Sequence, residues 1–289
     1  MRHFSLVRAA AVAAAGIISV GMATSALAQF TITPGGANAG NGVFSQGAPA
    51  TTGTGAGNAT ANFRPGNSTS PDQMFQDQWW FRGPGDTREF AFANQPAGAP
   101  AQTMVTVGDN TGNLPTGGFD STVTSTAYTV AAQFRWTIVA GPSGPTVNYT
   151  AMFTNTGAAP IDLTVFSYKD FDVNASAGTD TWTNSGGNTY TITDGPSTVV
   201  WRSNNPPSAF QTTAFATLRT ALSDTAVTNL TNTDAGSPGD FTGAFQYNLA
   251  LAPNQPQTIA GSFSMSVPEP ASLGLLGVAA LGLARRRRS

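Results

Sequence analysis

The sequence predicts an all-β protein whose main body folds as an antiparallel β-sandwich with one or two short helices. Alternation of apolar and polar residues with period two recurs from about Gln102 onward. Turn clusters rich in glycine and proline separate the alternating runs, and the 289-residue chain contains 32 glycines and 19 prolines. Many short strands joined by such turns are typical of sandwiches. The pattern does not distinguish a jelly-roll-like from an immunoglobulin-like order.

Residues 1–28 have the features of a secretory signal peptide. Arg2 and Arg8 form a charged start, an apolar core follows, and Ala26 and Ala28 give the small-x-small pattern that signal peptidase requires. We predict cleavage after Ala28. The signal helix carries the chain's single histidine, His3, and the chain contains no cysteine. The mature body therefore lacks the residues of histidine-dependent triads, cysteine nucleophiles and zinc sites built from His or Cys.

Residues 29–69 are rich in Gly, Asn and Thr, with Phe44 and Phe63 as the main large apolar side chains. So little apolar surface predicts a flexible or loosely ordered lead-in. The alternative is a set of loops, or one early strand near 42–45, laid over the β-rich domain that we place at 70–267.

A short helix is predicted over 70–79, because Ser70 and Gln73 have capping-box spacing and Pro71 occupies the first helical position. Trp79, Trp80 and Phe81 follow. Three adjacent aromatic side chains cannot all point to one face of a strand, so we expect at least one to be exposed or to lie under a loop, where it can stack on a sugar ring. The alternative is that the three rings fill one end of the core.

The strands are predicted from alternation and from the turns between the runs. Turn residues at 141–145 separate the alternating runs 132–140 and 146–154. This arrangement predicts an antiparallel hairpin with one buried face. A second helix is predicted after Ser208, where Phe215, Leu218 and Leu222 have helical spacing. The alternating segments are 132–140, 146–154, 161–171, 189–193, 198–202, 241–251 and 259–267.

Charge and motif content limit the function. Residues 29–267 hold seven basic and fourteen acidic side chains, a net charge of −7, without a basic cluster. This argues against nucleic-acid binding. Asp170 and Asp172 lie two apart on a predicted strand and share a face, so an Asp-based glycan hydrolase is one alternative. Nothing else in the sequence supports catalysis, and we predict that the body is not an enzyme.

Oxygen-bearing residues after the 161–171 strand suggest a calcium site, and calcium is the one candidate cofactor. They are Asp170, Asp172, Asn174 and Asp180. Their spacing begins like a calcium-binding loop. It departs from an EF-hand at Ala175, where glycine is needed, and at Thr181, where glutamate is needed. The alternative is that these side chains shape the turn through hydrogen bonds to the backbone.

The end of the chain has three parts in fixed order. An apolar run over 271–284 separates a rigid, extended Pro-Glu-Pro from a block of arginines. The residues concerned are Val267, Pro268, Glu269, Pro270, Arg285, Arg286, Arg287 and Arg288. As a helix, the apolar run spans roughly 21 Å, less than the hydrocarbon core of about 30 Å. The arginines would remain on the cytoplasmic side.

This order of parts resembles the PEP-CTERM sorting signal, here 268–289, of Gram-negative envelope proteins. The resemblance implies processing by exosortase, a membrane-embedded enzyme, after transient anchoring in the cytoplasmic membrane. It also implies a role with extracellular polysaccharide, biofilm matrix or the cell surface. The alternative for the tail is a buried helix or a permanent weak anchor.

The body also resembles a recurrent type of PEP-CTERM surface protein, through the tryptophan-rich opening, the Phe-Ser-Tyr-x-Asp-x-Asp segment at 166–172 and the Gly-Asp-Phe-Thr-Gly-Ala-Phe-Gln segment at 239–246. That resemblance implies no activity. We expect an exported structural or binding protein of the envelope or extracellular space. Its expected partners are signal peptidase, an exosortase-like enzyme, the membrane through the C-terminal helix, and extracellular polysaccharide. The alternative is a carbohydrate-binding module that uses the 79–81 rings.

Overall fold

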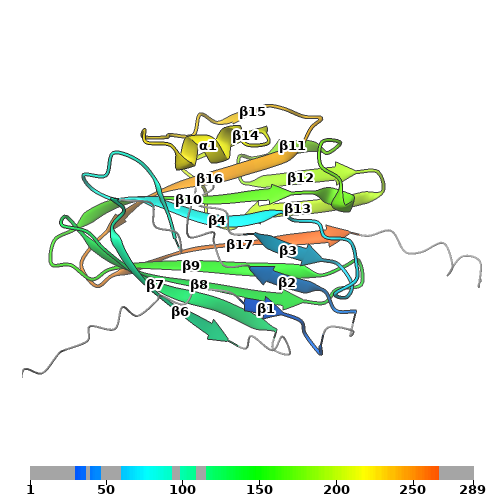
Figure 1. Ribbon diagram of the computed structural model, residues 1–289, viewed down its shortest axis with the longest axis horizontal. Coiled ribbons are helices and arrows are strands. Elements are labelled where there is room, and N and C mark those ends of the chain that lie inside the picture. Colours follow the sequence, from blue (N-terminus) through cyan, green and yellow to red (C-terminus); the bar gives the residue numbers. More distant parts are fainter. Residues whose placement is uncertain (1–29, 37–39, 47–59, 93–97, 109–114, 267–289) are drawn as a thin grey trace, which may run out of the picture.

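The computed structural model describes residues 30–36, 40–46, 60–92, 98–108 and 115–266. This part of the chain is almost entirely β-structure in stacked antiparallel sheets, which confirms the predicted sandwich class. Figure 1 shows the strands of both large sheets running along the long axis, with α1 over one side.

The smaller of the two large sheets has six strands. All neighbouring pairs are antiparallel except β14 with β15. In spatial order the strands are β15 (Thr233–Asp234), β14 (Ala209–Ala214), β16 (Phe241–Leu251), β10 (Ile161–Phe171), β4 (Gln76–Arg82) and β5 (Phe90–Ala91). The helix α1 (Thr217–Ser223) packs on β14 and β16.

The larger sheet has eight strands, and every neighbouring pair is antiparallel. In order they are β11 (Thr181–Ser185), β12 (Thr189–Asp194), β13 (Ser197–Ser203), β17 (Pro256–Ser266), β9 (Thr146–Asn155), β8 (Thr129–Val139), β7 (Thr116–Thr124) and β6 (Ala101–Gly108). The expected hairpin is β8 with β9. The two alternating runs near the end, β16 and β17, belong to different sheets.

Period-two alternation produces the core between these sheets. On β8, for example, Phe134 and Trp136 are buried while Gln133 and Arg135 are more exposed. The same face of the larger sheet carries Tyr149 of β9, and all of these rings belong to one continuous cluster. Burial of aromatic side chains on this scale supplies the driving force for folding in a chain without disulfides.

The lead-in contributes a third, three-stranded sheet to this core. Its strands are β1 (Phe30–Ile32), β2 (Val43–Gln46) and β3 (Ala61–Arg64). Phe44 and Phe63 both contact the ring of Phe263, at centroid distances of 5.5 and 5.1 Å. The early strand that we considered near 42–45 corresponds to β2. The segment packs because its few aromatic rings are completely buried.

The helix expected over 70–79 is wrong. Residues 71–75 have no regular structure, and β4 begins at Gln76. The Asp72 carboxylate accepts a hydrogen bond from Phe63 N (2.8 Å), and Phe75 N donates to Asp170 O (2.9 Å). These bonds hold the segment extended beside two neighbouring strands, so the capping-box spacing starts no helix.

The exposure expected for the aromatic triplet is also wrong. The relative exposures of Trp79, Trp80 and Phe81 are 1%, 2% and 0%. The side chains do alternate, with Trp79 and Phe81 in the main core. Trp80 points to the other face of the sheet, where a second cluster with Leu218 and Leu222 of α1 covers it. The part of the smaller sheet that lies under α1 is therefore buried on both faces.

The second predicted helix is shorter than expected, because its first half is the strand β14. Backbone pairing of β14 with β16 over 209–214 takes precedence over the helical spacing. The helix begins only at Thr217, and Phe215 lies before it and is 41% exposed.

Both terminal segments lie outside the described residues. The signal peptide at 1–28, with Ala26 and Ala28, and the sorting signal from Val267 to Arg288 are among the residues not described. Within the described ranges, no helix is long and apolar enough to span a membrane. A short 3₁₀ turn, η1 (Val173–Ala175), follows β10 and leads into the region of the site.

Candidate metal centre

Four neighbouring strands of the six-stranded sheet have an end at the same boundary of the sheet. Strands β14 and β10 end there, and β16 and β4 begin there. We call this boundary, formed by strand ends, the edge of the site. Phe241 opens β16 and pairs with Phe171 at the end of β10 on one side and with Ala214 at the end of β14 on the other. The residues immediately beyond the strand ends therefore gather along this edge. They are Phe215 after β14, Asp240 before β16, Asp172 after β10 and Phe75 before β4.

Three carboxylates converge at this edge. Asp170, Asp172 and Asp240 each offer an oxygen within 4.8 Å of the others. Asp170 and Asp172 share a face because they are two residues apart, and Asp240 comes alongside through the pairing of Phe171 with Phe241. We call these three residues the acidic triplet. It lies on the α1 side of the sheet, since Tyr168, two residues before Asp170, belongs to the cluster beneath α1.

Burial and mutual repulsion disfavour ionisation of the triplet. Asp170 is 1% exposed, and neither of its carboxylate oxygens has a hydrogen-bond partner among the described residues. Desolvation, followed by the charges of Asp172 and Asp240, raises its pKa to about 8, although Arg219 opposes this. Burial, followed by the charges of Asp240 and Asp72, raises the pKa of Asp172 to about 6, and burial also raises the pKa of Asp240. A bound cation would offset the cost of desolvating these carboxylates and the repulsion between their negative charges.

Asp180 lies next to the triplet but is not one of its members. Its backbone oxygen accepts a hydrogen bond from Gly239 N at 2.8 Å, which ties it to the residue before Asp240. Both of its carboxylate oxygens are buried and, within the described part of the chain, have no hydrogen-bond partner. Burial and then the charges of Asp194 and Asp172 raise its pKa to about 8. When ionised, it adds to the negative potential at the site.

Asn174 shapes the turn and does not join the triplet. Its side-chain amide donates to Asp194 O (2.6 Å), and its Oδ1 accepts from Ser197 Oγ (2.6 Å). It also adopts a left-handed conformation with φ of 61°, which asparagine tolerates. This role is the turn-shaping alternative considered for the whole set. Sequence reasoning missed Asp240, although the Gly-Asp-Phe segment that contains it had been noted.

A hard divalent cation fits the donors of the triplet. Carboxylate oxygens are the ligands that Ca²⁺ and Mg²⁺ prefer, and Ca²⁺ takes 6–8 oxygens at 2.3–2.6 Å in flexible geometry. Three carboxylates leave room for further oxygen ligands from water or from a bound molecule. No histidine or cysteine lies in the body, so soft-metal coordination has no ligands here.

The triplet opens into a cavity of about 230 Å³ with an aromatic wall. The rings of Phe75 and Phe215 lie 6.4 Å apart at 69°, and each side chain is 41% exposed. The remaining lining residue is Ala177, besides the three acids themselves. The rings expected to stack on a ligand, at 79–81, offer no free face, because all three are buried.

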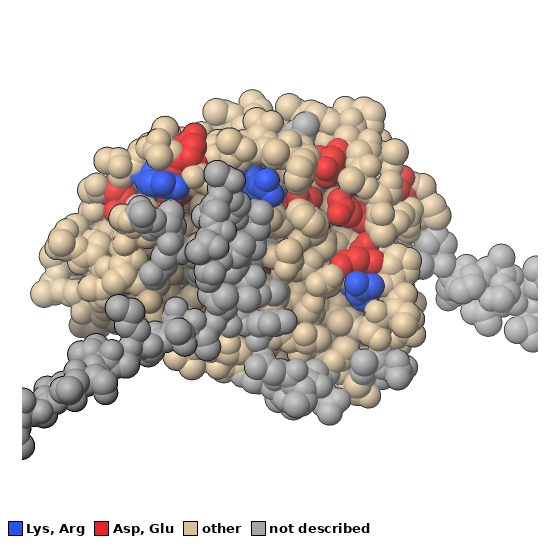
Figure 2. All heavy atoms as spheres, viewed as in Figure 1, with Lys and Arg blue, Asp and Glu red and all other residues tan. Residues whose placement is uncertain are grey.

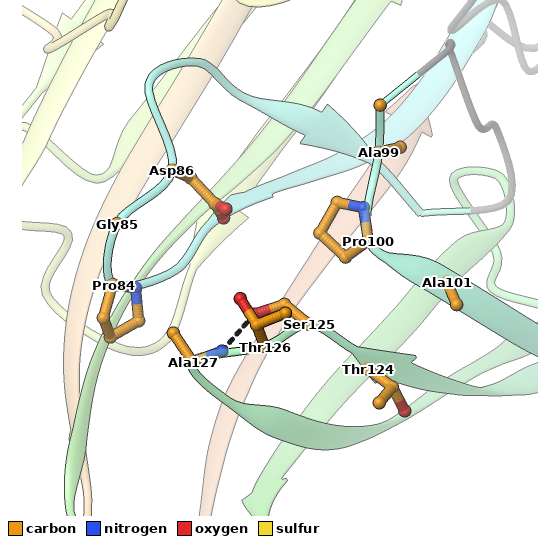
Figure 3. A pocket seen from close by; sticks show the side chains of 11 residues that line it. Pro84, Gly85, Asp86, Ala99, Pro100, Ala101, Thr124, Ser125, Thr126 and Ala127 are labelled. Carbon is orange, nitrogen blue, oxygen red and sulfur yellow. Dashed lines mark hydrogen bonds between the residues drawn. The ribbon is translucent and has the colours of Figure 1, made fainter.

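A larger cavity, of about 560 Å³, lies between the loops at 84–86, 98–101 and 124–127 (Figure 3). Small side chains and backbone form most of its wall. Its one carboxylate, Asp86, already accepts hydrogen bonds from Tyr128 Oη (2.5 Å) and Gly83 N (2.7 Å). This cavity therefore offers fewer free polar groups for binding or catalysis than the acidic triplet does.

The described surface on the face shown in Figure 2 carries acidic and basic side chains in small separate groups, without a continuous basic patch. This agrees with the excess of acidic residues in the body. Together, fold and site define a β-sandwich protein with a cluster of three acids, one buried and two half-buried, suited to a hard cation. The chain carries a sorting signal as well: residues 266–288 match the family model described as the PEP-CTERM protein-sorting motif.

No curated protein sequence matches the chain. Among solved structures, the fold is similar to one described as a kojibiose phosphorylase from the human microbiome, with 9% identity, a TM-score of 0.49 and coverage of 88% of this chain and 33% of that one. A bacterial glucoamylase in complex with acarbose has 11% identity, a TM-score of 0.49 and coverage of 87% and 35%. A protein of Escherichia coli K12 described as an aldose 1-epimerase has 10% identity, a TM-score of 0.46 and coverage of 83% and 99%.

The chain thus spans about one third of the first two proteins. These structures correct our expectation that the body is not an enzyme, because the proteins with a similar fold are described as a phosphorylase, a glucoamylase and an epimerase. At this level of identity the likeness concerns the fold, and it assigns none of those activities to this chain.

Proposed function

We propose that this protein is an exported, exosortase-sorted protein of the cell envelope or extracellular matrix, whose β-sandwich body binds calcium at Asp170, Asp172 and Asp240. The sorting motif supports export and processing by an exosortase. In this proposal the signal peptide is 1–28, the lead-in 29–69, the extracellular domain 70–267, and the sorting signal 268–289. The matrix role and the contact with extracellular polysaccharide are part of the proposal.

One observation carries the metal assignment. The Asp170 carboxylate is buried, lies within 4.8 Å of two other carboxylates, and lacks a hydrogen-bond partner in the described chain. An unpaired carboxylate in such a place is strongly disfavoured unless it is protonated or binds a cation. Its convergence with two further carboxylates provides the set of oxygen ligands that a cation needs.

Calcium fits better than magnesium. Magnesium demands near-ideal octahedral geometry at 2.0–2.1 Å and keeps several of its waters, whereas calcium accepts more ligands in irregular arrangements. Asp170 and Asp172 come from the end of β10, and Asp240 comes from the residue before β16, so the three ligands are not arranged symmetrically. Such a site suits a cation with several carboxylate ligands and flexible coordination.

Calorimetric titration of calcium into the protein purified from its host, after treatment with chelator, tests this assignment. We expect saturable heat and a rise in melting temperature, with a weaker response to magnesium. Asp170→Asn should abolish both effects. Asp162→Asn is the matched control, because Asp162 lies on the same strand, is exposed, and carries the same charge. Absence of calcium binding by the unmodified protein would overturn the assignment.

Mass spectrometry tests the sorting part of the proposal independently. The protein recovered from its host should begin at Gln29 and end near Pro270. An intact arginine-rich tail in the mature protein would contradict processing.

A further inference from the structure

We infer that the cavity beside the acidic triplet is a calcium-dependent subsite for one neutral pyranose ring, whose apolar face lies against Phe75 and Phe215 and whose adjacent hydroxyls complete the coordination of the cation. This inference rests on the proposed calcium site. It assigns the stacking surface to rings other than those at 79–81.

The two phenylalanine rings converge over the acids. Phe75 precedes β4 and Phe215 follows β14, and two strands, β10 and β16, lie between them. At about 4.8 Å between neighbouring strands, the backbones of β4 and β14 are separated by roughly 14 Å. The ring centroids are nevertheless 6.4 Å apart. Both side chains must therefore lean inward above the carboxylates that the intervening strands carry.

The solvent exposure of Phe75 and Phe215 is unusual in the described part of this molecule. In the described chain, the large apolar side chains that are exposed are Phe75, Val105, Val139, Phe215 and Val227. Both aromatic members of this set line the same cavity. Nearly all other described aromatic rings are buried in the core. An exposed aromatic pair beside unpaired carboxylates therefore points to a ligand with an apolar face and polar edges. A sugar ring has this combination.

The backbone and the neighbouring side chains fix the position of Phe215. Ala216, the next residue, adopts φ of 69°, a left-handed conformation that is strained for alanine. Leu218 N donates to Thr213 Oγ1 at 3.1 Å, and Leu218 is buried under the helix. The Arg219 guanidinium carbon lies 5.3 Å from the Phe215 centroid. The ring is therefore held next to the acids before any ligand arrives.

Charge selects a neutral sugar. The two charges of calcium and the charge of Arg219 beside Phe215 together balance the three ionised carboxylates, so the site itself has no excess positive charge. The body as a whole carries a net charge of −7 over residues 29–267. An anionic polysaccharide would be repelled by this field over distances near the Debye length. Vicinal hydroxyls provide neutral oxygens that can fill the open coordination positions of the cation.

Affinity electrophoresis of the host-purified protein tests the subsite, with dextran, galactan, mannan and the host's own neutral exopolysaccharide as probes and alginate as the anionic comparison. We expect retardation by at least one neutral glycan in calcium, loss of retardation in chelator, and none with alginate. Phe215→Leu should weaken glycan binding about tenfold because it removes the ring. Phe215→Trp should retain binding, as should the control Val139→Ala, and none of these variants should change the calcium titration.

The outcomes separate this inference from the calcium proposal. If calcium binds but no neutral glycan retards the protein, or if retardation persists in chelator, the subsite is overturned and the metal site stands. If calcium does not bind, the proposed function fails first. Release of reducing sugar from a retained glycan, lost in Asp170→Asn, would assign the acids to catalysis and would also overturn the subsite as stated.

Discussion

Lys169 Nζ lies 2.6 Å from Asp77 Oδ1, and both side chains are completely buried between the two large sheets. The residues are cross-strand partners on β10 and β4. Trp136 Nε1, from the opposite sheet, donates to Asp77 Oδ2 at 3.0 Å, and the ammonium group lies 4.7 Å from the Tyr149 ring centroid. Burial lowers the pKa of Lys169, while the charge of Asp77 opposes that shift. This polar contact fixes how the two sheets sit on each other.

Lys169→Met should therefore lower the free energy of unfolding by about 3–5 kcal/mol, because it leaves the Asp77 carboxylate buried without its partner. The double variant Lys169→Met with Asp77→Leu removes both charges and should recover at least half of that loss. Urea denaturation of the two variants measures the difference. Equal stability of the single and double variants would show that the ion pair does not account for the loss.

In the absence of calcium, the melting temperature should fall as the pH rises from about 5 to about 9. Aspartates in the unfolded chain lose their protons near pH 4, whereas the folded pKa values are about 6 for Asp172 and about 8 for Asp170 and Asp180. The folded state thus binds more protons over this range, and stability that is present below the unfolded pKa is lost as the pH passes the folded values. Arg219 is the basic group near Asp170 that weakens the effect.

Thermal melts in chelator over this pH range measure the trend. Asp170→Asn should give a flatter profile, and Asp162→Asn should keep the slope of the unmodified protein. Calcium added at pH 8.5 should restore the melting temperature. A melting temperature that rises with pH in chelator would contradict the picture of protonated, buried acids.

Trp79→Ala should cost about 3–5 kcal/mol of unfolding free energy, because the ring is 1% exposed in the main core. Phe75→Ala, only four residues earlier, should cost less than about 1 kcal/mol, since that ring is 41% exposed. Denaturant unfolding of both variants compares a packing ring with a surface ring. Similar losses would mean that Phe75 is needed for the fold.

Gly118→Ala should cost at least about 2 kcal/mol, since overpacking at a tight backbone contact forces a shift of the strand. A Cβ atom at this position of β7 would lie 2.0 Å from Phe134 O on β8. Thr122→Ala, an exposed change on the same strand, is the control and should be nearly neutral. Circular dichroism melts measure both. A stable Gly118→Ala variant would show that β7 can move away from β8.

Alternation predicted individual strands well. The segment 161–171 is β10 with the same ends, and 241–251 is β16, because each strand has a face that packs in the main core. It failed where a strand is covered on both faces. At least one of the rings at 79–81 was expected to be exposed or to lie under a loop, yet α1, some 140 residues later in the chain, covers the face of the sheet on which Trp80 lies.

The candidate site, too, was predicted from the sequence only in part. Sequence spacing identified Asp170 and Asp172, since two residues on one strand face share a direction. It also included Asn174, which the turn uses, and it missed Asp240. Asp240 reaches the site only because β16 pairs with β10 in a particular register. Phe215 reaches the site through the pairing of β14 with β16, and Phe75 reaches it through the pairing of β4 with β10.

The sequence alone determined the β class, the turns and the presence of the sorting signal, because each of these depends on residues adjacent in the chain: period-two burial, proline and glycine geometry, and an ordered Pro-Glu-Pro, apolar and arginine segment. Tertiary structure decided which faces are covered and which carboxylates meet. These depend on the pairing of strands some 70 residues apart, whose register is set by the packing of the whole core.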